Sequence, residues 1–274
     1  SVFGHGELPM TRMLASVNGP AEAEIALAGG ADIIDLKDPT RGALGAVASG
    51  VIGATVQAVG KRRLVSAVAG DLPMRPDLVA AAVRDIAATG VDYVKLGIFP
   101  DGDAAGCVRA LAEIAPLVKL VAVFFADAAP DFGLLPLLRQ SGFAGAMVDT
   151  RGKAAGRLLD HFDVTRLRGF VADCHGLDLI VGLAGSLEAP DIPRLLVLAP
   201  DLLGFRGALC GPGGRTAALD AERVRAVRDL IPPEGQEPVV REVDYRLLAA
   251  RGYAPEAAGD GVPVDLVLVE DFVL

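Results

Sequence analysis

Eight short runs of Val, Ile, Leu and Ala recur along this chain, and each is followed by a longer stretch with a helical pattern. Short apolar runs indicate buried strands, whereas apolar residues three and four positions apart indicate helices. Strands that alternate with helices form parallel sheets through right-handed crossovers. Eight such units favour a sheet closed into a single (β/α)8 barrel, an α/β fold. The predicted strands are residues 13–17, 33–36, 64–68, 93–97, 120–124, 146–148, 179–184 and 202–206.

The segments between these runs support a barrel over an open, doubly wound sheet. Ala-rich stretches at 77–89 and 103–118 have helical spacing, and 221–231 closes the series after the last strand. No GxGxxG motif follows the first strand, which argues against a dinucleotide-binding sheet. The chain is 52% hydrophobic, has no Trp and is only 5% aromatic. That balance suits parallel strands buried on both faces.

The barrel units account for residues 10–231 of the 274. A (β/α)8 barrel typically takes about 250 residues. Residues 1–9 precede Met10 and look like a vector-derived remnant. Residues 232–274 are rich in Pro, Gly and Glu up to about 263 and become strand-like at the end. They are either a linker with a C-terminal arm or the start of a truncated second domain.

Charge and cysteine content narrow the class of function. A net charge of −9 argues against nucleic acid as a partner, because phosphate neutralisation needs a basic surface. Three distant cysteines form neither a disulfide framework nor a metal pair, and no metal-ligand spacing is present. No apolar run approaches the roughly 20 residues of a membrane span, and nothing resembles a signal peptide. We therefore expect a cytoplasmic protein with neither membrane nor metal.

Strand alternation places charged side chains inside the predicted barrel. Ile34 and Leu36 share one face of the second strand, so Asp35 and Lys37 take the other face and point into the barrel mouth. The same argument turns Lys95 inward on the fourth strand.

On the sixth strand alternation turns Asp149 inward, and Lys153 follows it in the loop. A lone lysine at a strand end is usually a solvated rim residue, and an inward Lys–Asp pair can be purely structural. Buried charges cost several kcal/mol unless they are well paired, and a second inward lysine adds repulsion. Burial and repulsion lower the pKa of a lysine and make its amine nucleophilic near neutral pH. The pattern therefore favours a catalytic cluster.

Small residues follow the last two predicted strands. Gly185 and Ser186 follow the seventh, and Gly207 and Ala208 follow the eighth. Such turns allow backbone N–H groups to approach an anion, and this end of the fold is its usual phosphate site. We predict a phosphate site here, with Arg206 adding charge; the alternative is that the glycines only turn the chain.

Four other polar residues carry weaker signals. Asp71 and Asp127 follow the third and fifth strands, where they either orient a water or hydroxyl or cap loop amides. We expect His175 to be structural, at the opposite end of the barrel, and His161 to be exposed in a helical stretch.

Six segments, in order along the chain, closely resemble the (5-formylfuran-3-yl)methyl phosphate synthase family, also called 4-(hydroxymethyl)-2-furancarboxaldehyde-phosphate synthases. The resemblance spans about residues 11–230, and the segment at 29–46 is quite specific. The segments are GGADIIDLKDPTRGALGA (29–46), VSAVAGDLP (65–73), DYVKLGIF (92–99), MVDT (147–150) with Lys153, LAGS (183–186) and FRGALCGPGGR (205–215).

The resemblance implies a Schiff-base-forming carbon–oxygen lyase that condenses two molecules of glyceraldehyde 3-phosphate, without cofactor or metal. The product belongs to the route to the furan of methanofuran-type one-carbon carriers. Lys37 takes the family's Schiff-base position and Lys95 its proton-acceptor position. Asp35, Asp149 and Lys153 match further active-site positions, although the loop around Lys153 looks shorter than in archaeal relatives.

Two other functions compete with this expectation. One is a simple class I aldolase acting on a triose or pentose phosphate. The other is a non-catalytic metabolite-binding barrel. In each case we expect the partner to be a phosphorylated small molecule. We also expect a homo-oligomer, because many barrels of this kind associate.

Overall fold

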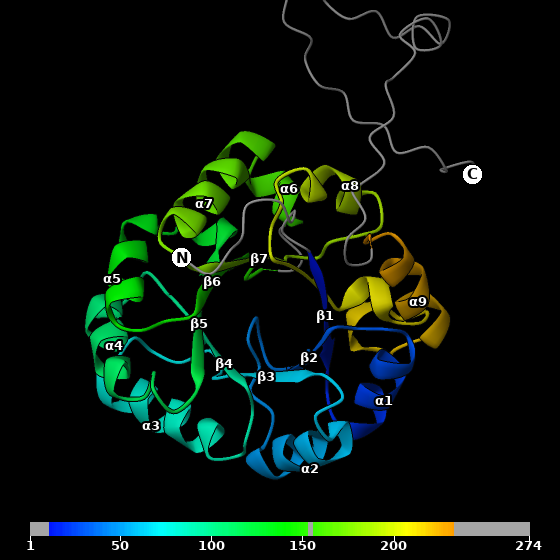
Figure 1. Ribbon diagram of the computed structural model, residues 1–274, viewed down its shortest axis with the longest axis horizontal. Helices are drawn as coiled ribbons and strands as arrows, with labels where there is room; N and C mark the ends of the chain where they lie inside the picture. The colour runs from blue at the N-terminus through cyan, green and yellow to red at the C-terminus, as the bar shows by residue number, and fades with distance from the viewer. Residues whose placement is uncertain (1–10, 153–155, 233–274) are drawn as a thin grey trace, which may run out of the picture.

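A computed structural model describes residues 11–152 and 156–232. Eight parallel strands form a closed barrel in chain order, with helices around the outside (Figure 1). The strands are β1 (Arg12–Val17), β2 (Ile33–Leu36), β3 (Leu64–Val68), β4 (Tyr93–Gly97), β5 (Lys119–Phe125), β6 (Gly145–Asp149), β7 (Ile180–Leu183) and β8 (Leu202–Phe205). The predicted (β/α)8 barrel is confirmed.

The barrel closes where the first strand pairs with the last. Met13 of β1 lies opposite Leu203 of β8, and Ala15 lies opposite Phe205. All other strands pair with their neighbours in sequence. Closure leaves no free sheet edge, so the carboxyl ends of all eight strands meet at one mouth.

The outer layer consists of helices that connect successive strands. They are α1 (Pro20–Ala28), α2 (Ser49–Val59), α3 (Pro76–Ala87), α4 (Ala104–Ala110), α5 (Leu135–Gln140), α6 (Leu158–His161), α7 (Val164–Gly176), α8 (Asp191–Leu196) and α9 (Ala221–Asp229). Short 3₁₀ turns are η1 (Leu111–Glu113), η2 (Ala126–Ala128), η3 (Phe132–Leu134), η4 (Gly207–Leu209) and η5 (Gly214–Thr216).

The helix predicted over 103–118 is shorter than expected. It runs as α4 and then tightens into η1, which ends at Glu113. Pro116 explains the early end, because its ring lacks an N–H and clashes with the carbonyl four residues earlier. The α4 start is set by Asp103, whose carboxylate accepts from the Gly106 N–H at 2.7 Å.

The strands are buried along nearly their whole length. In β2, β4, β6 and β8 every residue is buried. Inside the barrel, Gly182 leaves room for its neighbours, since a Cβ there would lie 2.6 Å from both Leu202 Cδ1 and Met147 Cγ. Burial on both faces is why these strands read as apolar runs rather than as alternating patterns.

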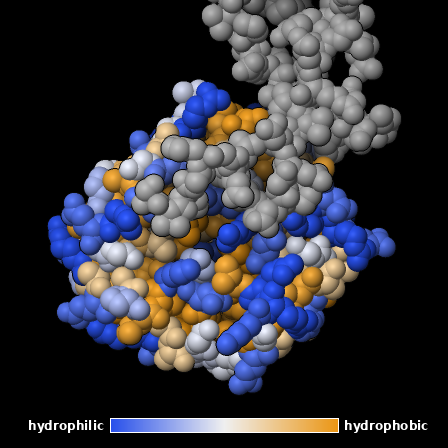
Figure 2. Space-filling model, viewed as in Figure 1, coloured by the Kyte–Doolittle hydropathy of each residue, from blue (hydrophilic) through white to orange (hydrophobic). Residues whose placement is uncertain are grey.

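The surface of the described residues is mixed in character. Hydrophilic side chains are spread around the face in Figure 2, with apolar ones between them. No helix among residues 11–152 and 156–232 is both long and apolar enough to cross a membrane.

Candidate active site

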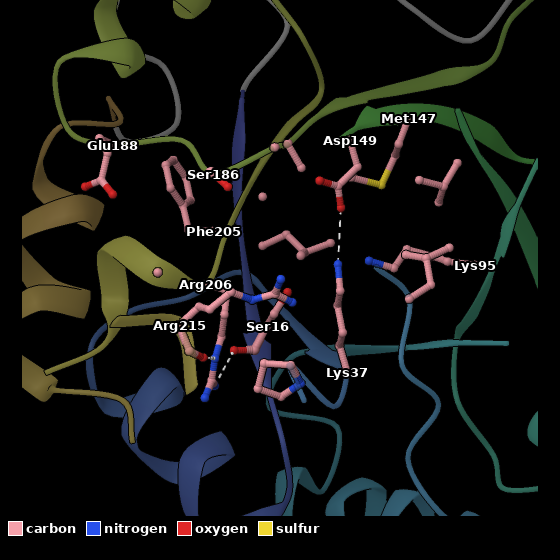
Figure 3. Close-up of a pocket in the computed structure, with 18 of the residues that line it drawn as sticks. Ser16, Lys37, Lys95, Met147, Asp149, Ser186, Glu188, Phe205, Arg206 and Arg215 are labelled. Atoms are coloured by element: carbon pink, nitrogen blue, oxygen red, sulfur yellow. Dashed lines mark hydrogen bonds and ion pairs between the residues drawn. The ribbon is translucent and has the colours of Figure 1, made fainter. Parts of the chain in front are cut away.

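A pocket of about 270 Å³ opens at the carboxyl ends of the strands (Figure 3). That size is near the lower limit for small-molecule sites. Its charged and hydroxyl-bearing lining residues are Ser16, Lys37, Lys95, Asp149, Ser186, Glu188, Arg206 and Arg215. They come from β1, β4, β6 and the segments after β2, β7 and β8, which brings together residues up to 199 positions apart in sequence (Ser16 and Arg215).

Lys37 forms an ion pair with Asp149 across the barrel. The Lys37 Nζ lies 3.2 Å from Asp149 Oδ2, and each side chain is only 9% exposed. Lys37 directly follows β2, where its N–H donates to the Val17 carbonyl at 2.9 Å and holds the β2 end against β1. Figure 3 shows the amine and the carboxylate facing each other. The predicted inward direction of both side chains is confirmed.

Lys95 forms a second pair, with Asp35. Its Nζ lies 2.7 Å from Asp35 Oδ2, and the Asp35 side chain is fully buried. Two hydroxyls complete the carboxylate's shell: Ser66 donates to Oδ1 at 2.6 Å and Ser16 to Oδ2 at 3.0 Å. With three donors around it, the buried Asp35 carboxylate is stabilised inside the barrel.

Burial lowers the pKa of the Lys95 amine below its usual range. Desolvation is the largest cause, and the positive charge of Lys37 acts in the same direction. The Asp35 carboxylate opposes the shift. The site thus contains a lysine whose neutral form is more accessible than that of an ordinary lysine, as the sequence predicted for this cluster.

The two pairs cross the barrel between different strands. Asp149 of β6 neutralises Lys37, which follows β2, and Asp35 of β2 neutralises Lys95 of β4. The fifth predicted catalytic residue, Lys153, lies outside the described residues.

The turn after β7 has an unusual backbone. Gly185 has φ 121°, and Ser186 has φ 53°, a left-handed conformation that costs a non-glycine residue about 1–2 kcal/mol. A Cβ at Gly185 would lie 3.0 Å from Thr150 Cγ2, so the turn also packs closely against the β6 end. Strained backbone of this kind is typical of functional loops.

The two predicted phosphate turns present free backbone donors. Within the part of the chain that the structure describes, the N–H groups of Gly185, Ser186, Gly207 and Ala208 donate to no acceptor. All except Ala208 belong to residues that line the pocket.

The structure uses Arg206 differently from the prediction. Its guanidinium forms an ion pair with Glu22 of α1, with Nη1 2.5 Å from Oε2. Its remaining donors bind the carbonyls of Ser16, Arg215 and Ala217 at 3.1, 2.8 and 2.9 Å. With all five N–H groups occupied, Arg206 has no donor left for an anion. This geometry argues against the predicted phosphate contact from Arg206.

Arg215 is a pocket cation that the sequence reasoning missed. It lines the pocket from η5, and burial lowers the pKa of its guanidinium. It is the last residue of the FRGALCGPGGR segment. Because it lies well beyond the predicted strand, side-chain alternation along that strand could not predict its direction. The available signal was the Gly213-Gly214 turn before it, which can carry a side chain back over the mouth.

Asp71 and Asp127 cap loop amides, the second of the two predicted roles. Asp71 accepts from the N–H groups of residues 43 and 44 at 3.0 and 2.9 Å, which ties the loop after β2 to that after β3. Asp127 accepts from those of residues 151 and 152 at 2.7 and 2.6 Å. Neither carboxylate lines the pocket.

The two described histidines lie outside the pocket lining. His175, in the last turn of α7, lies 3.0 Å from Asp201 at the amino end of β8, a position that fits the structural role expected at the far end. The expected exposure of His161 is wrong: it is half-buried, and its Nε2 is buried with no hydrogen-bond partner among the described residues. Among the described residues no group of three His, Cys, Asp or Glu side chains could hold a metal ion.

A (β/α)8 barrel with two buried lysine–aspartate pairs in a mouth pocket has the architecture of a barrel enzyme. The particular family follows from the sequence: residues 13–228 match the family model of 4-HFC-P synthase, and this chain belongs to that family.

Several relatives carry the corresponding enzyme name. The (5-formylfuran-3-yl)methyl phosphate synthase of Methanococcus maripaludis is 36% identical over 234 residues, covering 79% of this chain and 99% of its own length. That of Methanopyrus kandleri is 37% identical, covering 80% and 98%. A Methylorubrum extorquens chain, provisionally given the same name, is 48% identical, covering 78% and 88%.

Solved structures support the fold. A 3-keto-L-gulonate-6-phosphate decarboxylase from Vibrio cholerae superposes with a TM-score of 0.58 at 13% identity, covering 82% of this chain and 100% of its own. The 3-hexulose-6-phosphate synthase from Salmonella typhimurium superposes at 0.54 and 18%, covering 79% and 98%. At such low identity the likeness concerns the barrel alone.

Proposed function

We propose that this enzyme condenses two molecules of glyceraldehyde 3-phosphate into (5-formylfuran-3-yl)methyl phosphate through a Schiff base on Lys37. One phosphate and two molecules of water leave in the overall reaction. The observation that carries the proposal is the pair of crossed lysine–aspartate contacts in the mouth pocket of a chain from this family. A lysine-dependent mechanism needs an amine, a proton acceptor and counter-charges, and these four groups supply them.

Lys37 is the better nucleophile of the two lysines. Its Nζ contacts Asp149 at 3.2 Å, a loose contact that a substrate carbonyl can replace. Lys95 is held at 2.7 Å by a carboxylate that two serines fix in place. We therefore assign imine formation to Lys37 and proton transfer to Lys95.

The chemistry proceeds from the charge on the imine. Protonated imine at Lys37 acidifies the adjacent carbon of the first triose phosphate, and neutral Lys95 accepts that proton. The resulting enamine attacks the aldehyde carbon of the second molecule and forms the new carbon–carbon bond. Asp149, now beside the iminium, stabilises its charge and assists the loss of water. A hydroxyl of the second molecule then attacks the iminium carbon, which closes the ring and expels the Lys37 amine. Phosphate elimination and dehydration give an aromatic furan, which makes the overall reaction favourable.

The phosphate groups are held at the turns after β7 and β8. The free N–H groups of residues 185–186 lie in a strained, closely packed turn, and those of residues 207–208 lie at the start of η4; together they offer an anion backbone donors from two turns. Lys153, beyond the described residues, is proposed to act with the second phosphate.

The test is the product mass formed from glyceraldehyde 3-phosphate. The wild type is expected to release the furan phosphate, which also absorbs in the ultraviolet. Lys37→Arg keeps the charge but cannot form an imine, so product should fall by at least a thousandfold (~4 kcal/mol). Lys119→Arg, on an exposed lysine at the start of β5, is the matched control and should retain activity.

Borohydride reduction separates the rival functions. A reduced substrate adduct on Lys37 together with furan product supports the synthase. An adduct with only a reversible aldol product would mean a class I aldolase instead. No adduct on any lysine would leave a metabolite-binding barrel.

The family name suggests a place in the synthesis of a methanofuran-type carrier. We propose that the enzyme works in the cytoplasm and as a homo-oligomer. Gel filtration with light scattering tests whether the enzyme is a homo-oligomer.

A further inference from the structure

Arg215 reaches the mouth pocket from η5, a turn held by its own backbone hydrogen bonds and by contacts with Arg206. Its Cβ lies 4.0 Å from the position a Cβ would occupy at Gly207, so the side chain starts beside the turn after β8. In Figure 3 its guanidinium extends toward the interior of the pocket, on the side where Lys37 and Asp149 face each other. The charge of Asp149 acts on the Arg215 guanidinium, which places the two groups in one electrostatic environment.

The guanidinium of Arg215 has no partner among the described residues. No carboxylate or carbonyl in residues 11–152 and 156–232 accepts a hydrogen bond from it. It is nevertheless half-buried, so its charge loses part of its hydration, and the charge of Asp149 offsets that loss only in part. A cation in this condition is poised for an anionic ligand.

Arg206 and Arg215 have different roles at this turn. Arg206 is neutralised by Glu22 and donates its Nε hydrogen to the Arg215 carbonyl at 2.8 Å. The Arg206 Nη2 also donates to the carbonyl of Ala217, the residue after η5, at 2.9 Å. Arg206 therefore fixes the backbone of the turn, and Arg215 keeps its own side chain free.

We propose that Arg215 is the charged ligand of the substrate phosphate at the turns after β7 and β8, and that Arg206 is the residue that positions it. The free N–H groups of residues 185–186 and 207–208 supply neutral donors, and Arg215 adds a two-pronged cationic one suited to phosphate oxygens. The proposal rests on the proposed function for the identity of the substrate, but it predicts phosphate binding by itself.

Binding of glycerol 3-phosphate, which has no aldehyde, tests this without catalysis. Isothermal titration should show that Arg215→Ala weakens binding about tenfold or more. Arg215→Lys should recover part of the loss, because it restores charge but not the fork. Arg225→Ala, on an exposed arginine of α9, removes the same charge and should bind within twofold of wild type. Arg215→Ala binding within twofold of wild type would overturn the proposal.

Imine trapping supplies a second readout. With borohydride, Arg215→Ala should need about tenfold more glyceraldehyde 3-phosphate for half-maximal labelling of Lys37, yet unchanged amounts of unphosphorylated glyceraldehyde. Equal loss with both aldehydes would place Arg215 at the reacting amine and refute a phosphate role. Arg215-dependent binding of glycerol 3-phosphate without furan formation would support this inference and reject the proposed function.

Discussion

Asp35 shows how single residues set the chemistry of the pocket. Its carboxylate is fully buried and accepts from Lys95, Ser16 and Ser66. The two hydroxyls lower the cost of keeping an anion inside the barrel, and the anion in turn limits how far the pKa of Lys95 falls. Two residues outside the reacting pair thereby help decide the protonation state of Lys95.

Replacing Asp35 should shift the pH dependence of catalysis. Asp35 raises the pKa of Lys95, so Asp35→Asn should lower that pKa further. Because Lys95 accepts a proton only when neutral, the limb of kcat/KM that rises with pH should move to lower pH. Rates measured across the pH range, with the exposed Asp77→Asn as control, check this. A limb that stays in place or moves to higher pH would contradict the assignment.

At the scale of elements, capping carboxylates hold the loops of the mouth. Asp71 and Asp127 each bind two successive backbone N–H groups of a neighbouring loop. Asp127 joins the turn after β5 to residues 151–152, immediately before Lys153. These contacts explain how loops with little secondary structure keep their shape next to the pocket.

Loss of the Asp127 contacts should expose the loop after β6. In Asp127→Ala two backbone donors lose a charged acceptor, so local opening becomes easier by about 1.5–3 kcal/mol. Trypsin cleavage after Arg151 should then accelerate about tenfold or more. Asp131→Ala is the matched control, because its carboxylate caps only the exposed Gly133 of η3. Equal cleavage rates in the two variants would show that the Asp127 hydrogen bonds do not hold this loop.

At the scale of the whole molecule, the Glu22–Arg206 pair joins the first and the last β/α units of the barrel. Glu22 belongs to α1, the first helix, and Arg206 follows β8, the last strand. The side chains are 6% and 10% exposed, and Glu22 also accepts from the N–H groups of Asn18 and Leu219. The pair is thus part of how the first and last units meet.

Breaking this pair should be costly, and removing it whole should not. Arg206→Met leaves a buried carboxylate, so unfolding by urea should show a loss of about 3–5 kcal/mol. The double variant Arg206→Met with Glu22→Leu should recover much of that loss. The exposed pair Arg62–Glu24, disrupted by Arg62→Met, should cost no more than about 1 kcal/mol. A double variant as unstable as Arg206→Met alone would show that the pair is more than charge compensation.

Sequence alone determined the eight strands to within two residues at each end, because burial on both faces makes them apolar runs. Alternation along a strand also determined that Asp35, Lys37, Lys95 and Asp149 point inward, since that direction is a local property of the backbone. Which lysine pairs with which aspartate was decided only by the tertiary structure, because barrel closure sets the distances between strands. The same holds for the two arginines: Arg206 is next to a strand and Arg215 is remote from it in sequence. Only the fold shows that Glu22, 184 positions before Arg206, binds the Arg206 guanidinium, and that Arg215 faces the pocket.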